Sequence, residues 1–384
     1  MKISDVRLRV VLLAGCLGVA TLATIALSRR FSVLRDSRLA VLAGLLVLMA
    51  SSADAHHSSL PHFDPTKPVT LAGVITGFKL VNPHAYLYFD VTGQDGKVTH
   101  WNCEMTAGSV LQRSGWTGEL FAPGAVVTVN AIAARRDPNG CSFTSAVLKD
   151  GTRIERSGVI TRGAIVAKNA DAATPQARNL TTLSGTWITT PRAGGGGPGS
   201  DNPFIKLMTA AGKAAAEKYD DRFDDPALRC SPSSIQRAWG EPAGVSEIVQ
   251  TPTTITIKHE YMDTVRLVDL RTRQHPAAVK RSLTGHSVGW FEGSTLVIDT
   301  TGFSSGVLLP HPGVMNSEDM HVVERLSLSA DGNQLVRSYE VTDAKFLAAP
   351  MTGTSSWTRT ALPLSTYNCT ELSGVNNVRP KAAR

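Results

Sequence analysis

From residue 69 onward the chain alternates apolar and polar residues in short runs, which are separated by glycine, proline and Asp-Gly turns. In a strand such alternation puts successive side chains on opposite faces, so the pattern predicts β-structure with one face buried. Helical patterns are few, namely a short run at 109–113 and an alanine-rich run at 203–219. The expected fold class is therefore all-β.

The first group of strand-like runs lies at 69–77, 85–91, 97–104, 125–131 and 142–148. The short helix at 109–113 separates the third run from the fourth. Three strands, a helix and two more strands are typical of a small five-stranded OB-like barrel. We expect residues 56–160 to form this domain. Residues 161–182, most of which lack periodicity, are expected to form a linker.

A second group of runs predicts a larger domain at 183–384, opened by Gly185-Thr186-Trp187. The expected strands lie at 247–261, 264–270, 287–291, 295–299, 321–329, 334–342 and 354–359. Seven or eight antiparallel strands predict a lipocalin-like closed barrel, which either encloses one small apolar ligand or is filled by side chains. The aromatic residues expected to line a ligand cavity are Trp290, Phe291, Phe303 and Trp357.

The first 55 residues resemble an export signal. Arg35 and Arg38 precede a 12-residue apolar run, which is too short to span a bilayer, and Ala53-Asp54-Ala55 forms a cleavage site. Cleavage after Ala55 predicts a periplasmic or secreted protein. An upstream apolar stretch at 10–27 is either a marginal membrane span or the product of a start codon assigned too early.

Two rival signals lie in the same leader. The run 13–16 ends in Cys16 and resembles a lipoprotein box, whereas 28–31 partly resembles a twin-arginine signal. Membrane attachment is expected only if the leader stays uncleaved or is lipidated.

The charge balance argues against nucleic acid as a partner. The formal net charge is +7, but the first 55 residues hold seven basic and three acidic side chains, so the remainder carries only +3. A chain so close to neutral, without runs of lysine or arginine, lacks the electrostatic footprint of phosphate-backbone binding.

Four of the five cysteines follow the leader, and an even number in an exported chain predicts two disulfides. The domain division pairs Cys103 with Cys141 and Cys230 with Cys369, although four cysteines allow three connectivities. No C-x-x-C pair is present, which disfavours zinc.

Cleavage of the leader would create a new amino terminus whose residues favour copper binding. Cleavage after Ala55 leaves His56 and His57 first, and an amine with imidazole nitrogens suits Cu(II). Cleavage after Ala53 instead places His56 third, which favours the same metal. His84, in a turn between two strands, is the expected additional ligand, and His62 is a second candidate. Copper binding is thus an alternative function.

Acid–base catalysis in the second domain is a third hypothesis, with His286, Asp299 and His321 as candidate residues. A histidine and a carboxylate on neighbouring strands can share a proton. No Gly-x-Ser-x-Gly elbow, His-Glu-x-x-His motif or dinucleotide fingerprint accompanies them. A hydrolase, isomerase or dehydratase therefore ranks below a binding protein for a small, mainly apolar molecule.

Several motifs resemble known families. Residues 56–155 resemble an exported proteobacterial family of unknown function through His56-His57-Ser58, Phe63-Asp64-Pro65, Asn82-Pro83-His84 and Gly115-Trp116. The second half resembles a lipocalin-like domain of uncharacterised secreted bacterial proteins through the segments 285–293, 295–303 and 321–325. The resemblance implies export and a barrel fold, and it carries no catalytic residues.

Overall fold

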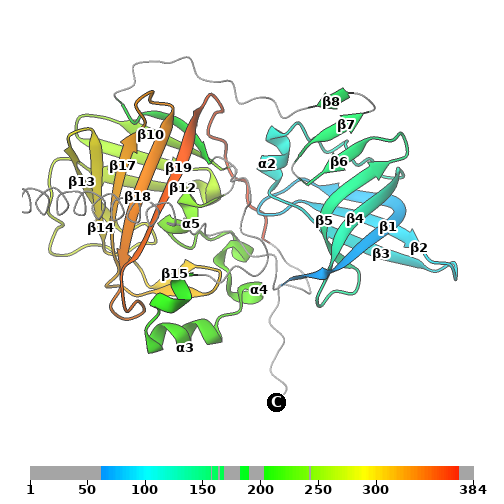
Figure 1. Ribbon diagram of the computed structural model, residues 1–384, viewed down its shortest axis with the longest axis horizontal. Coiled ribbons are helices and arrows are strands. Elements are labelled where there is room, and N and C mark those ends of the chain that lie inside the picture. Colours follow the sequence, from blue (N-terminus) through cyan, green and yellow to red (C-terminus); the bar gives the residue numbers. More distant parts are fainter. Residues whose placement is uncertain are drawn as a thin grey trace, which may run out of the picture. The chain divides into compact units, whose positions relative to one another are not determined.

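The computed structural model describes residues 62–371 except 157, 163–164, 168–181, 190–202 and 242–243 (Figure 1). The leader predicted at 1–55 and most of the predicted linker lie outside these residues. No helix in the described part of the chain is both long and apolar enough to cross a membrane.

The first sheet is built from the strands β1 Phe63–Lys79, β2 Tyr86–Thr92, β3 Val98–Glu104, β4 Val126–Ala134, β5 Gly140–Leu148, β6 Arg153–Glu155, β7 Ile160–Arg162 and β8 Ile165–Ala167. A short helix, α2 Gly108–Arg113, follows β3. The pairs β1–β2, β2–β3, β3–β5, β5–β4 and β4–β1 close a ring, in which only β3–β5 is parallel. β7 and β8 occupy the first residues of the predicted linker.

The core of this ring is aromatic and is fastened by a disulfide. Trp116, Phe121 and Phe143 pack edge to face, and Trp116 Nε1 donates to Gly158 O at 3.0 Å. Cys103 and Cys141 are directly opposite in the β3–β5 register and form the predicted disulfide, with Cα atoms 4.4 Å apart.

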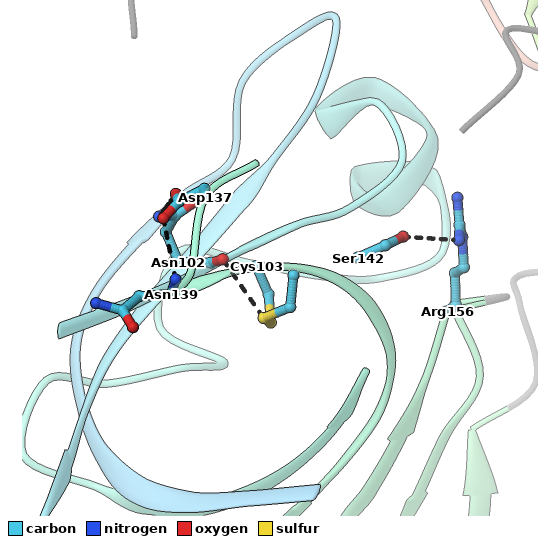
Figure 2. Close-up of a disulfide and its surroundings, with 7 residues drawn as sticks. Asn102, Cys103, Asp137, Asn139, Ser142 and Arg156 are labelled. Atoms are coloured by element: carbon cyan, nitrogen blue, oxygen red, sulfur yellow. Dashed lines mark hydrogen bonds between the residues drawn. A yellow bond between two sulfur atoms is a disulfide. The ribbon is translucent and has the colours of Figure 1, made fainter. Parts of the chain in front are cut away.

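The turn before β5 is fixed close to that disulfide (Figure 2). Asp137 accepts hydrogen bonds from the Asn139 backbone N–H at 3.0 Å and from Asn102 Nδ2 at 3.1 Å. The carboxylate therefore ties the turn to β3, which holds β5 in its parallel register with β3.

The second sheet is a closed barrel of nine strands (Figure 1). In barrel order they are β10 Val245–Gln250, β11 Thr254–His259, β12 Thr264–Asp269, β13 His286–Glu292, β14 Thr295–Thr301, β17 His321–Leu328, β18 Gln334–Thr342, β19 Met351–Thr360 and β9 Gly185–Thr189. β15 Gly306–Leu309 and β16 Val314–Asn316 form a separate hairpin. The predicted pair Cys230–Cys369 is also a disulfide.

Three expectations for this half need correction. The run 247–261 is two strands, because Thr251, Pro252 and Thr253 turn the chain between β10 and β11. The barrel is not wholly antiparallel, since β12 and β13 pair in parallel over two positions. The helix expected at 203–219 is a 3-10 turn, η1 Pro203–Leu207, followed by α3 Ala210–Lys218, whose N-cap is Thr209.

Short helices connect β9 to β10, namely α4 Asp221–Asp224, η2 Pro226–Arg229 and α5 Ile235–Trp239, and η3 Tyr261–Asp263 links β11 to β12. All five residues of α5 are buried. Ser234 caps α5 by accepting from Arg237 N at 3.1 Å, and its hydroxyl donates to Leu308 O at 2.7 Å. The cap thus orients α5 so that Trp239 enters the barrel core.

Candidate functional site

The barrel interior is filled by side chains. Its buried apolar cluster comprises Leu183, Trp187, Trp239, Ile248, Ile255, Ile257, Val268, Leu296, Ile298, Leu326, Leu335 and Trp357. The ring centroids of Trp239 and Trp357 lie 4.5 Å apart. Trp357, expected to line a ligand cavity, is therefore a core residue. Phe303, also expected there, is buried in a second cluster with Leu308, Leu309 and Val314.

A charged cluster shares the interior. Glu324 is fully buried between Arg337, whose Nε donates to it at 2.7 Å, and Arg266, whose Nη2 lies at 2.5 Å. Burial raises the pKa of Glu324, but the two guanidinium groups outweigh it and hold the pKa at about 2. Arg337 Nη2 also donates to Gln236 of α5 at 2.9 Å. The interior is thus occupied by an ion triad as well as by tryptophans.

The three predicted acid–base residues are brought together on the opposite face of the sheet. Asp299 Oδ1 lies 2.9 Å from His321 Nε2 and 2.9 Å from the Nε2 of His275, a residue of the loop after β12. The second ring nitrogen of His275, Nδ1, lies 2.9 Å from Nδ1 of His286. The result is a continuous chain of contacts from His286 to His275, to Asp299 and to His321.

Strand register explains why these side chains meet. Asp299 is opposite Val288 on β13 and opposite Val323 on β17. His286 and His321 are each two residues from those partners, so all three side chains are on one face. The neighbouring positions Ile298 and Glu324 point into the barrel core, which puts the cluster on the outer face.

Neighbouring groups shift the proton affinities of the cluster. The hydrogen bond to Asp299 raises the pKa of His321 despite burial. Burial raises the pKa of Asp299, but its hydrogen bonds with His321 and His275 prevail, and the pKa is below its usual value. Burial, and then the nearby His275, lower the pKa of His286. His286 is therefore neutral at neutral pH, whereas Asp299 is ionised.

The alternating strand pattern does not indicate His275, because this residue lies in the loop between β12 and β13. A signal was present nonetheless. His275 is eleven positions before His286 and follows a polar run, Arg271-Thr272-Arg273-Gln274, which cannot be core. A loop of this length can fold back over the outer face of β13.

A surface pocket of about 410 Å³ lies at one end of the barrel. Its lining residues are Gln250, Thr251, Pro252, Leu270, Arg271, Thr272, Arg273, Gly289, Trp290 and Phe291. The guanidinium of Arg273 lies over the Trp290 ring, 5.0 Å from its centroid. Arg271 is held by Asp269 through two hydrogen bonds of 2.9 Å. Two of the four predicted ligand residues, Trp290 and Phe291, thus line a pocket.

Gly289 has a steric role beside this pocket. A Cβ at this position would lie 2.7 Å from Val268 Cγ1 and 3.1 Å from Val297 O. Glycine therefore allows β12 to approach β13 closely at their short parallel pairing.

The predicted copper ligands are only partly visible. His56 and His57 lie outside the described residues. His84 Nδ1 lies 3.0 Å from the Met105 carbonyl oxygen and 3.4 Å from Glu104 Oε1. Among the described residues, no group of three or more histidine, cysteine, aspartate and glutamate side chains has an arrangement that could hold a metal ion.

Comparison with known proteins finds one family match, which covers part of the chain. Residues 43–142, less than half of the chain, match the model of a family of unknown function (DUF6152). No curated protein matches. Among solved structures, a secretary abundant heat soluble (SAHS) protein from Ramazzottius varieornatus is similar at 11% identity and a TM-score of 0.24, over 48% of this chain and 100% of that one. The N-terminal part of the chain thus resembles a family whose function is itself unknown.

Proposed function

We propose that the protein is an exported binding protein for a small, mainly apolar molecule, which it holds in the pocket at the end of the nine-stranded barrel. One observation carries this proposal: the pocket volume of about 410 Å³ is within the range of small-molecule sites. Tryptophans and the Glu324 ion triad occupy the interior between the described strands.

The pocket lining suggests the chemistry of the ligand. Leu270 and Phe291 offer apolar walls, and Trp290 offers a ring on which a planar group can stack. Arg273 supplies a positive charge over that ring, where cation–π attraction holds it in place. We therefore propose a ligand with a flat apolar body and one anionic group.

We also propose an architecture for each of the two domains. The ring of pairings among β1 to β5 supports an OB-like barrel for the N-terminal domain, and the closed nine-stranded sheet supports a lipocalin-like barrel for the C-terminal domain. The export proposal rests on the leader sequence alone. Copper binding by His56, His57 and His84 stays a prediction.

Titration with 8-anilinonaphthalene-1-sulfonate, an aromatic anion, tests the pocket in an isothermal calorimeter. The full mature chain is expected to bind one equivalent. Trp290→Ala should weaken the affinity by at least about tenfold, because the stacking surface is lost. Arg273→Ala should weaken it by less and make it less sensitive to salt.

Leu267→Ala is the matched control. Leu267 is an exposed apolar residue of β12 that does not line the pocket, so its removal should leave the affinity unchanged. No binding to the wild-type chain, or equal affinities for wild type and Trp290→Ala, would contradict the proposal.

A further inference from the structure

The contact chain on the outer face of the barrel determines where its protons lie. An ionised carboxylate only accepts hydrogen bonds, so both His275 and His321 present an Nε2–H to Asp299 Oδ1. With a single ring proton, at Nε2, His275 has an unprotonated Nδ1. The nitrogen 2.9 Å away, Nδ1 of His286, must carry the proton of that contact. His286 is left with a lone pair on Nε2.

We propose that His286, His275 and Asp299 form an acid–base relay, in which Nε2 of His286 takes a proton from water as that water attacks an ester. His286 is the catalytic residue, and His275 and Asp299 are positioning residues. This activity goes beyond the proposed ligand binding and does not use the pocket residues.

The step balances with water as the only co-reactant. The water oxygen forms a bond to the carbonyl carbon while His286 Nε2 accepts one water proton. The tetrahedral intermediate then collapses, the carbon–oxygen bond to the leaving group breaks, and the alkoxide or phenolate departs. The acid product retains the other proton. The imidazolium shares its charge through Nδ1–H with His275 and Asp299, then returns the proton to solvent.

The geometry of the relay is more typical of a catalytic base, here His286, than of a simple ion pair at the surface. Two imidazoles in series connect Nε2 of His286 to a carboxylate, so each ring is held in a single tautomer. No described residue donates to or accepts from Nε2 of His286. The pair formed by His100 of β3 and Asp90 of β2, with its 2.6 Å contact, lacks such a second histidine.

The charges that face His286 predict its pH dependence. His275 is packed against its ring with centroids 5.1 Å apart and lowers its pKa, whereas Asp269 raises it. On the far side of the relay, Asp299 and Glu340 act on His321. Because the net effect on His286 is downward, its base form should persist to a lower pH than that of an ordinary histidine. The hydrolysis rate should therefore level off by neutral pH.

Hydrolysis of p-nitrophenyl acetate by the full mature chain tests the relay. His286→Ala should lower the protein-dependent rate by at least about tenfold, in line with the loss of a general base. Asp299→Asn should lower it as well and shift the pH at which the rate levels off. His100→Ala, which removes the unrelated His–Asp pair, should leave the rate unchanged. Equal rates for wild type and His286→Ala would overturn the proposal.

A second measurement does not depend on activity or on the folding of a variant. Long-range ¹H–¹⁵N correlation spectra near neutral pH should show the Nδ1–H tautomer for His286 and the Nε2–H tautomer for His275. Free imidazole side chains favour the Nε2–H form, so an Nε2–H signal for His286 would overturn the relay. Wild-type ester hydrolysis without anilinonaphthalene sulfonate binding would overturn the pocket proposal alone, and binding without hydrolysis would overturn the relay alone, which separates the two proposals.

Discussion

Buried charge is the most demanding feature at the scale of single residues. Glu324, Arg266 and Arg337 are each at most 2% exposed. Such a group is tolerated only because each charge has a partner, and the loss of one partner leaves an uncompensated charge in a medium of low polarity. A single substitution in the triad should therefore lower the free energy of unfolding strongly.

Glu324→Gln should lower the free energy of unfolding by about 3–5 kcal/mol, because two buried guanidinium groups lose their carboxylate. Urea denaturation followed by tryptophan fluorescence measures it. Glu292→Gln is the matched control, since Glu292 and Arg325 form a 2.6 Å ion pair with both side chains 49% exposed. Glu292→Gln should lower the free energy of unfolding by at most about 1 kcal/mol. A similar loss in both variants would contradict the prediction.

His259 predicts how stability depends on pH. Its ring contacts Trp239, and Nδ1 lies 2.8 Å from Ser246 Oγ. Burial, and then the charges of Arg266 and Arg337, lower its pKa from 6.5 to about 3. Between those values the unfolded chain binds a proton that the folded chain does not. Stability therefore falls as the pH falls through this window.

His259→Gln should remove that dependence. Between about pH 7 and pH 5 the wild type should lose about 2 kcal/mol more than the variant, the amount expected for one such histidine. The other histidines are common to both proteins, so their contributions cancel in the comparison. Urea denaturation at each pH gives the two slopes, and parallel slopes would show that His259 is not kept neutral by burial.

At the scale of elements, α5 decides what the nine-stranded barrel can hold. This helix of five residues places Trp239 against Trp357 and Gln236 against Arg337. Both side chains of this helix therefore occupy space between the barrel strands. The pattern of the strands alone does not indicate this filling, because α5 comes from a different part of the chain.

Trp239→Ala should lower the free energy of unfolding by about 3–5 kcal/mol, as expected when the loss of a large buried side chain leaves a cavity. Trp290→Ala, at the surface pocket, should cost about 1 kcal/mol or less. Thermal and urea denaturation compare the two. Equal costs for the two variants would contradict the view that Trp239 fills the barrel.

At the scale of the whole molecule, the disulfides constrain the chain over very different lengths. Cys103–Cys141 spans 38 residues, whereas Cys230–Cys369 spans 139 and ties the segment after β19 to the turn after η2. Closing a longer loop removes more freedom from the unfolded chain. Disulfides also persist in oxidising compartments, which supports the export proposal.

Replacing each cysteine pair by serine should lower the free energy of unfolding by about 5 kcal/mol for Cys230–Cys369 and by about 4 kcal/mol for Cys103–Cys141. Denaturation of the oxidised protein and of each double variant measures both losses. Thiol titration of the unreduced mature chain in denaturant should find no free thiol, and any free thiol would contradict the pairing.

Local pattern was sufficient for the all-β class and for most strands, because alternation over six to nine residues is a property of each strand by itself. The disulfide pairs followed from the domain division, which favoured one of three connectivities. The sequence also offered His286 or His321 as an acid–base partner of Asp299 on a different strand, and the structure brings all three together. Local pattern failed at 247–261, where a Thr-Pro-Thr turn interrupts a continuous apolar pattern, and at the helix expected at 203–219.

Only the tertiary structure decided which residues lie inside the barrel and which lie on its outer face. Alternation assigns residues to two faces but does not say which face is inside, and here the inside is closed by a helix from a different part of the chain. Phe303 and Trp357 therefore became core, while Trp290 and Phe291 reached a pocket. His275 joined the relay because a loop folded back over β13, a long-range contact that no local period encodes.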